Sequence, residues 1–355
     1  MDGGLFITLF DEKTLALYLK YGVYGFLMKP VFEEQPSSRS MHYAALADYA
    51  CSREGTHIFF FLKRKIIYGG VVKGSREFAS FYLNGNTSPF GRKVNAPLFW
   101  DESSRYTPTG KAGVFTVRGT AKSQPYILLF DAVDDLSGKY VSSDELYFEL
   151  GKYPYPLPSN TIQGMSFCTL TPGETDAAIK LCRESSLKHG LASSESLAIG
   201  DDNTLFNPGL LDLSGFINEA HLEFTLLADI EPLKHLLEHD SFILCRQVPI
   251  SPFKPFQMDR ADICLYSSSH PICNGTIPNV IIELKKDRGN FQAYNQVSRY
   301  LKWLNKICDP EDFEAILPLI VAPSFYINRA KADLGFEDKI IMYALDTKTT
   351  YSFLK

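Results

Sequence analysis

The chain has 355 residues, of which 45% are hydrophobic, 22% charged and 13% aromatic. This composition is typical of a globular protein and excludes a fibrous or largely disordered chain. The length favours two domains, because a single core rarely grows beyond about 250 residues. With 36 Lys and Arg against 41 Asp and Glu, the formal net charge is −5. A nucleic-acid site would therefore have to be a local basic patch or depend on a metal ion.

The sequence favours a cytoplasmic location. No run of 18 apolar residues predicts a membrane-spanning helix, and the segment MDGGLFITLF has no basic flank of the kind that a signal peptide carries. The seven cysteines are scattered and form no C-x-x-C pair. We expect most of them to be small buried hydrophobic residues with free thiols, which fits a reducing compartment.

Short apolar runs separated by Gly, Pro, Asn and Ser are frequent in the first half of the chain. They lie at residues 58–62, 66–72, 113–117 and 126–130. This spacing predicts a small β-barrel. Helices are predicted over residues 41–50 and 172–192. Between two of the apolar runs, Lys63, Arg64 and Lys65 indicate a hairpin tip, which is either an ordinary solvated turn or a nucleic-acid contact.

The second half of the chain follows a different pattern. Residues 193–215 are rich in Ser, Asp, Asn and Gly, which predicts a linker between domains at 1–192 and 216–355. After this linker the expected elements alternate, and their order predicts an α/β domain with a mixed sheet. They are a helix at 218–237, strands at 242–250, 261–266 and 279–284, a long amphipathic helix from 291 to 307, a strand at 315–321, a helix at 329–334 and a strand at 339–344.

One group of charged residues in the second half suggests chemistry. Glu283 and Lys285 are two apart in a predicted strand, so they share a face. Asp262 interrupts the preceding apolar strand, which is an unfavourable place for an unpaired acid. If the two strands are neighbours, the carboxylates of Asp262 and Glu283 converge and suit Mg²⁺ or Mn²⁺, which bind few protein oxygens besides water and phosphate. Lys285 would then orient the nucleophile or stabilise charge on a phosphate.

The neighbouring polar residues allow two interpretations each. The pattern E-x-K is weak by itself and recurs at residues 337–339, where no acid on an upstream strand accompanies it. Glu219 is either an acid that favours a helix N-terminus or a third acidic group near the metal. Gln292 and Gln296 are four apart on the predicted helix and share a face, which either is a solvated stripe or lines the site.

Residues 217–345 resemble the C-terminal nuclease domain of the NucS/EndoMS family, within the PD-(D/E)xK or restriction-endonuclease-like superfamily. The segments that carry the resemblance follow the order of the family, at residues 218–222, 246–249, 260–263, 282–285, 296 and 299–301. The resemblance implies a mixed sheet flanked by helices and a magnesium-dependent nuclease site. It implies that Asp262 and Glu283 are the metal ligands and that Lys285, Glu219 and Gln296 complete the catalytic residues.

The first half is similar to PUA-like barrels of the EVE, YTH and ASCH kind. The similar segments are residues 55–61 with the helix before them, 66–72, 96–100 and 162–167. The similarity implies an aromatic pocket for a modified or flipped base, which needs stacking surfaces and hydrogen bonds to the base edge. Each candidate can also be an ordinary packing residue or loop acid. The candidates for this pocket are Trp100, Asp101, Tyr106, Phe81 and Tyr82.

Other enzyme classes lack support in the sequence. There is no G-x-S-x-G and no G-x-x-x-x-G-K-[ST], so we expect neither a serine hydrolase nor a P-loop ATPase. His235 and His239 are four apart on a predicted helix, but no further zinc motif accompanies them, and a helix surface is the expected place for both.

The leading hypothesis is a magnesium-dependent endonuclease that cuts double-stranded DNA as a homodimer, with an N-terminal recognition domain. A restriction enzyme, including one that depends on base modification, has this organisation. The alternatives are a mismatch or repair endonuclease of the NucS type and a binding protein that does not cut. The basic residues expected to contact DNA are Lys63, Arg64, Lys65, Lys285, Lys286, Arg288, Arg299 and Lys302.

Overall fold

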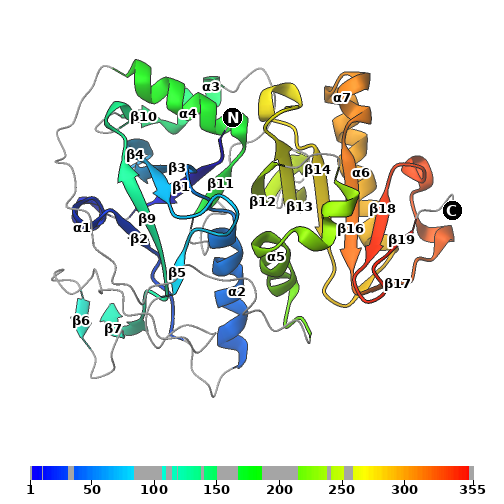
Figure 1. Ribbon diagram of the computed structural model, residues 1–355, viewed down its shortest axis with the longest axis horizontal. Helices are drawn as coiled ribbons and strands as arrows, with labels where there is room; N and C mark the ends of the chain where they lie inside the picture. Colours follow the sequence, from blue (N-terminus) through cyan, green and yellow to red (C-terminus); the bar gives the residue numbers. More distant parts are fainter. Residues whose placement is uncertain are drawn as a thin grey trace.

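A computed structural model describes most of the chain, and everything below refers to its described residues. These are residues 2–9, 11–30, 36–83, 106–108, 114–117, 119–136, 140–149, 167–185, 215–237, 241–251 and 259–351. The fold is mixed α/β with two main sheets, one in each half of the chain (Figure 1). Among the described residues, none of the helices combines the length and the apolar composition that crossing a membrane requires.

The N-terminal sheet is strongly curled into a half-barrel, as the sequence predicted for a barrel-like first half. Its strands follow the order β11-β1-β3-β4-β9-β2, with β10 paired to β4 and β5 paired to β9. Only β1 and β3 run parallel to each other. The strands are β1 (Gly4–Thr8), β2 (Val23–Gly25), β3 (His57–Leu62), β4 (Lys65–Lys73), β5 (Tyr82–Leu83), β9 (Tyr126–Ala132), β10 (Val141–Ser142) and β11 (Cys168–Leu170).

Helices cover both faces of this sheet, which explains the continuous apolar run of β3. Ile58 and Phe60 belong to the core on the side of α1 (Glu12–Tyr21) and α2 (Pro36–Ala50). Phe59 points to the other side, toward α3 (Ser143–Glu149) and α4 (Pro172–Glu184). A strand buried on both faces has no reason to alternate polar and apolar residues. A separate three-stranded sheet contains β6 (Tyr106–Pro108), β7 (Phe115–Val117) and β8 (Thr120–Lys122).

The C-terminal sheet has the order β12-β13-β14-β16-β18-β19. β12, β13 and β14 form an antiparallel meander, β14, β16 and β18 are parallel, and β19 returns antiparallel. The sequence predicted all of these strands except the last. Their bounds are β12 (Phe242–Ser251), β13 (Asp259–Ser267), β14 (Val280–Leu284), β16 (Leu317–Ala322), β18 (Ile341–Ala344) and β19 (Thr349–Tyr351).

Helix α6 (Phe291–Ile307) connects the parallel strands β14 and β16 and covers one face of the sheet. Its apolar side chains recur at three- and four-residue intervals, and Tyr294, Val297, Leu301 and Leu304 are all fully buried. Asn290 begins the helix by accepting hydrogen bonds from the first-turn amides of Gln292 and Ala293. The predicted amphipathic helix is therefore confirmed in position and in the face that it buries.

Two predicted helices differ in the structure. The helix predicted over 218–237 is instead α5 (Glu219–Ala228) followed by a 3₁₀ helix, Glu231–Leu236. Pro232 explains the break. Its backbone nitrogen has no hydrogen to donate to the carbonyl of Ala228 one turn earlier, and its ring would clash with that carbonyl. The helix predicted over 329–334 is two short 3₁₀ turns, Arg329–Lys331 and Leu334–Phe336. A short α-helix, α7 (Pro310–Glu314), was not predicted.

The two halves of the chain pack against each other through α2 and α5, which lie side by side where the sheets meet (Figure 1). At their centre the Arg246 guanidinium is buried. It donates at 2.5 Å to Asp48 Oδ1 of α2 and at 2.9 and 2.6 Å to the two carboxylate oxygens of Glu223 on α5. The backbone N–H of Arg246 also donates to Thr169 Oγ1 of β11. One cation thus joins three elements from both halves.

We expect Arg246→Met to destabilise the protein by about 3–5 kcal/mol, because it leaves the carboxylates of Asp48 and Glu223 buried without a counter-charge. Urea unfolding measures this change in the free energy of unfolding. The control is Arg183→Gln, whose ion pair with Asp135 is exposed and should be worth at most about 1 kcal/mol. Equal effects of the two substitutions would contradict the expectation.

Glu174 makes stability depend on pH. It forms a capping box with Thr171 at the start of α4, and burial raises the pKa of Glu174 from 4.5 to about 7. Because the folded state keeps the Glu174 carboxyl protonated to a higher pH than the unfolded state does, the stabilising contribution of this group is complete below pH 4.5. It is lost as pH rises through about 7. Between pH 5 and 8.5, the free energy of unfolding should therefore fall by up to about 3 kcal/mol less in the Glu174→Gln variant than in the wild type. Urea unfolding of both proteins at the two pH values checks this expectation.

Candidate active site

Asp262 and Glu283 lie side by side on neighbouring strands, on the face covered by α6. The ladder between β13 and β14 pairs Cys264 with Ile281, and both side chains belong to the core under α6. Asp262 and Glu283 are each two residues beyond that pair, so they share its face. The Asp262 Oδ2 atom accepts the backbone N–H of Leu284 at 2.7 Å. The Asp262 carboxylate thus accepts the backbone N–H of Leu284 at the point where the regular pairing between β13 and β14 ends.

Lys285 follows directly after β14 and contacts two acidic side chains. Its Nζ atom donates to Glu283 Oε1 at 2.9 Å and to the carbonyl oxygen of Leu284 at 2.7 Å. Glu219, the first residue of α5, lies 3.5 Å from the same Nζ through its Oε1 atom. The structure thus brings together four of the five predicted catalytic residues: Asp262, Glu283, Lys285 and Glu219.

Gln296 reaches the site only through another residue. Its Nε2 atom donates to the hydroxyl of Tyr300 at 2.6 Å. That hydroxyl lies 2.6 Å from the carbonyl of Arg260 and 3.3 Å from Glu283 Oε2, and its single proton can serve one of them at a time. Gln296 therefore orients the hydroxyl group that touches Glu283. Gln292, its predicted companion, is exposed.

Gln247 and Glu223 belong to the site although the sequence did not single out either. The β12–β13 ladder pairs Arg246 with Ile263 and Val248 with Ala261, so Gln247 and Asp262 both lie between these two pairs. The Nε2 atom of Gln247 donates to Asp262 Oδ1 at 3.1 Å and to Glu223 Oε1 at 3.3 Å. Its φ of 53° is unusual for a residue other than glycine. Both residue types are too common for the sequence to have marked them, and only the pairing of strands reveals their role.

The electrostatics of the site favour a cation. Burial, followed by the charges of Glu283 and Glu223, holds the pKa of Asp262 well above its usual value. Burial also raises the pKa of Glu283, against the opposing effect of the Lys285 ammonium. Burial alone would lower the pKa of Lys285, but Glu283 and Asp262 raise it overall, so this side chain stays protonated. One lysine thus compensates several clustered carboxylates.

The donor set fits Mg²⁺ or Mn²⁺. Among the described residues, no group of three or more His, Cys, Asp and Glu side chains is arranged as a preformed metal cage. Mg²⁺ binds proteins through one or two carboxylates and keeps water or phosphate in its other positions. Asp262 and Glu283 provide two such carboxylates whose mutual repulsion a divalent cation would relieve. They are the residues that would hold it.

Most basic residues expected to contact DNA are paired with carboxylates. In the hairpin turn, Lys63 pairs with Glu12 and Arg64 with Asp144, while Lys65 lies over the ring of Tyr140. These partners belong to the N-terminal half. Near the candidate site, Arg299 pairs with Asp259 and Lys302 with Asp333, and Lys286 lies 3.7 Å from Asp287. Arg288 lies over the ring of Tyr326.

The residues proposed for a base pocket have different positions. Trp100 and Asp101 lie outside the described residues, as does the side chain of Tyr106, whose backbone is in β6. Phe81 is fully buried and packs against Tyr49 and Tyr126, so it is part of the core. Tyr82 is partly buried in β5. Of the two histidines, His235 packs against a tyrosine ring, and His239 is not described.

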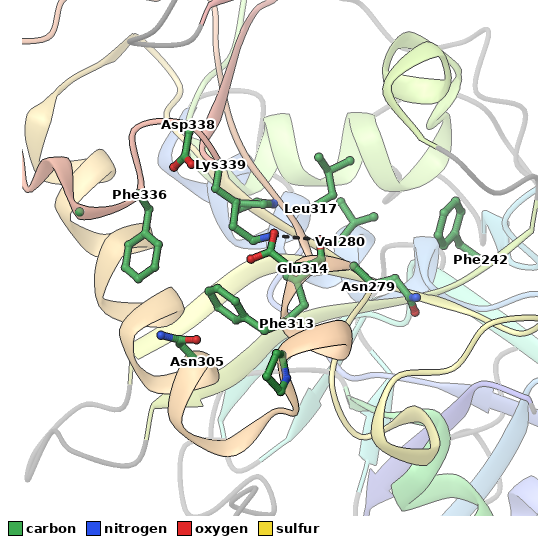
Figure 2. A pocket seen from close by; sticks show the side chains of 15 residues that line it. Phe242, Asn279, Val280, Asn305, Phe313, Glu314, Leu317, Phe336, Asp338 and Lys339 are labelled. Carbon is green, nitrogen blue, oxygen red and sulfur yellow. Dashed lines mark hydrogen bonds and ion pairs between the residues drawn. The ribbon is translucent and has the colours of Figure 1, made fainter.

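A cavity of about 560 Å³ lies at the opposite end of the sheet from the candidate site (Figure 2). It is lined by the N-terminal ends of β14 and β16, by α7 and by the second E-x-K segment. There, Lys339 donates to the carbonyl of Glu314 at 3.0 Å and lies over the Phe313 ring. Lys339 also pairs with the Glu314 carboxylate at 3.5 Å, so its partners are on α7, and within the described residues no acid on a neighbouring strand meets this second E-x-K segment as Asp262 meets Glu283.

Comparison with known proteins adds little to this geometry. No protein-family model and no curated protein matches the chain. Among solved structures, the fold has a distant likeness to a repair endonuclease from Pyrococcus abyssi, with 13% identity over 91% of this chain and 98% of that one. The TM-score is 0.25, a value at which likeness carries no functional inference. Any functional inference for this chain therefore rests on the geometry of the site residues themselves.

A divalent metal should stabilise the folded protein by binding at this site. Adding 10 mM Mg²⁺ or Mn²⁺ should raise the melting temperature of the wild type, because a ligand that binds only the folded state adds to its stability. Asp262→Asn should remove this increase. The control Asp338→Asn, in the second E-x-K segment, should behave like the wild type in a thermal-shift measurement.

Proposed function

We propose that this protein is a metal-dependent phosphodiesterase that cuts double-stranded DNA. The observation that carries the proposal is the convergence of Asp262 and Glu283 on neighbouring strands, with Lys285 hydrogen-bonded beside them. Two carboxylates and a lysine in this arrangement are the groups that metal-assisted hydrolysis of a phosphodiester requires. The raised pKa values of both carboxyls support the proposal, because a bound cation would stabilise the charged forms that burial and mutual repulsion disfavour.

Each residue has a defined task in this reaction. Asp262 and Glu283 would hold Mg²⁺, which when bound polarises the phosphate and lowers the pKa of the attacking water. Lys285 carries a positive charge that can stabilise the charge developing on the phosphate oxygens or orient the water. Gln247 and the backbone N–H of Leu284 fix the two oxygens of Asp262. The Tyr300 hydroxyl, held by Gln296, lies 3.3 Å from Glu283 Oε2 and can donate its proton there or to the Arg260 carbonyl.

The finer proposal is a restriction-type endonuclease whose N-terminal half recognises the DNA. A curled sheet in the first half, joined to the second half through Arg246, is consistent with a recognition unit that is fixed to a nuclease unit. A homodimer would provide the two sites that cutting both strands requires. Dependence on a modified base is one form of this function, and Trp100 and Asp101 remain its candidate contacts.

Cleavage of plasmid DNA by purified protein with Mg²⁺ tests the proposal. The substrates are matched unmodified, methylated and hydroxymethylated plasmids. We expect the wild type to cut at least one of them and Glu283→Gln to cut at least about 100-fold more slowly, because it removes a carboxylate from the metal site. The control Glu337→Gln, in the second E-x-K segment, should cut like the wild type.

The substrate pattern distinguishes the possible roles. Cutting of modified plasmids alone would support a modification-dependent enzyme, and cutting at fixed sites in all three would support conventional restriction. If Glu283→Gln cuts as fast as the wild type, the assignment of this site is wrong. If none of the plasmids is cut, a double-stranded DNA endonuclease of this kind is contradicted.

A further inference from the structure

Next to the candidate site, a small two-stranded sheet holds an arginine over an exposed tyrosine. The chain leaves β14 at Leu284 and enters β15 (Arg288–Gly289), which pairs in parallel with β17 (Ser324–Phe325). The N–H of Tyr326 donates to the carbonyl of Gly289 at 2.9 Å. A Cβ atom at residue 289 would come within 2.3 Å of the Phe325 ring, so the glycine is required for this close packing.

The guanidinium of Arg288 lies 5.1 Å from the centroid of the Tyr326 ring. Tyr326 is 65% exposed, and Arg288 is exposed as well. Stacking on a ring uses the face of a guanidinium and leaves its N–H groups, which lie in the plane, for other acceptors. Within the described part of the chain, no hydrogen bond or ion pair engages those N–H groups. The tyrosine therefore restricts the arginine without consuming its donors.

Several other surface arginines in the described ranges donate to carboxylates of the protein instead. Arg299 donates to both oxygens of Asp259 and to a backbone carbonyl, and Arg64 pairs with Asp144. Lys331 resembles Arg288 instead. Its ammonium lies 5.6 Å from the centroid of the Phe291 ring at the start of α6, and among the described residues no carboxylate pairs with it. Two ring-held cations thus flank the beginning of α6.

The first of these cations, Arg288, is close to the candidate catalytic lysine. Arg288 is three residues from Lys285, which limits their Cα atoms to about 11 Å. Successive phosphates of one B-DNA strand advance about 3.4 Å along the axis. Because the strand also winds around the axis, neighbouring phosphates are farther apart than this rise, and a strand bound at Lys285 passes within reach of Arg288 about one or two phosphates away. The planar fork of arginine also matches the geometry of a phosphate group.

We propose that Arg288 and Lys331, held over the rings of Tyr326 and Phe291, form a surface that binds the phosphate backbone of DNA beside the scissile phosphodiester. We name it the ring-held cation surface. The ring of Tyr326 restricts the Arg288 side chain before DNA binds, so fewer rotamers are lost on binding. This inference rests on the proposed function, because it takes DNA bound at the candidate site as the partner.

The experiment measures the salt dependence of DNA binding without metal. A fluorescein-labelled 20-base-pair duplex is titrated by anisotropy in EDTA between 50 and 200 mM KCl. Removing one cation that neutralises a phosphate should lower the slope of log Kd against log salt by about one. The double variant Arg288→Gln/Lys331→Gln should therefore lower the slope by about two. The control Lys180→Gln/Arg183→Gln removes two cations that are ion-paired on α4 and should leave the slope unchanged.

The tyrosine variants test the role of the ring. Tyr326→Leu should weaken binding several-fold without changing the slope, because the charge of Arg288 remains, and Tyr326→Phe should bind like the wild type. Equal slopes for the wild type and the Arg288/Lys331 double variant would overturn the proposal, as would a wild type that does not bind the duplex. A lowered slope in a protein that does not cut with Mg²⁺ would support the ring-held cation surface while contradicting the proposed phosphodiesterase.

Discussion

The buried guanidinium of Arg246 connects the two halves of this protein to each other and to the candidate site. Its donors satisfy Asp48 on α2 and Glu223 on α5, and its backbone N–H bonds to Thr169 on β11. Each carboxylate would be costly to bury without this cation, and the cation would be costly to bury without them. The relative position of α2 and α5 is therefore coupled to the conformation of β12, where Arg246 resides.

The neighbouring residue extends this coupling into the site. Gln247 is held by Glu223 and in turn holds Asp262, so a continuous set of hydrogen bonds leads from the interface to a candidate metal ligand. The positive φ of Gln247 turns its backbone away from regular strand geometry at this point. Unusual backbone conformations persist where the surrounding contacts over-determine them, and they concentrate at functional sites. The interface and the candidate active site are thus one structural unit.

The charge distribution also separates the candidate site from the rest of the surface. Elsewhere in the described residues, several exposed lysines and arginines each pair with a single carboxylate. At the C-terminal ends of β14 and β16 the acids instead crowd together around one lysine, and two cations lie over rings. Repulsion between these carboxylates costs stability in the isolated protein, and their placement side by side is understandable if they bind a cation and, through it, an anionic substrate.

The sequence alone determined the features that depend on local periodicity: the buried face of α6, all strands of the C-terminal sheet except β19, and the shared face of Glu283 and Lys285. A strand alternates every two residues and a helix repeats every 3.6, so these patterns are visible without partners. The break of α5 at Pro232 was also a local signal. Only the tertiary structure showed that β13 and β14 pair so that Asp262 meets Glu283, and that Gln247, Glu223 and Tyr300 hold the site. Their hydrogen-bond partners are distant in the chain, and strand pairing and helix packing alone bring them together.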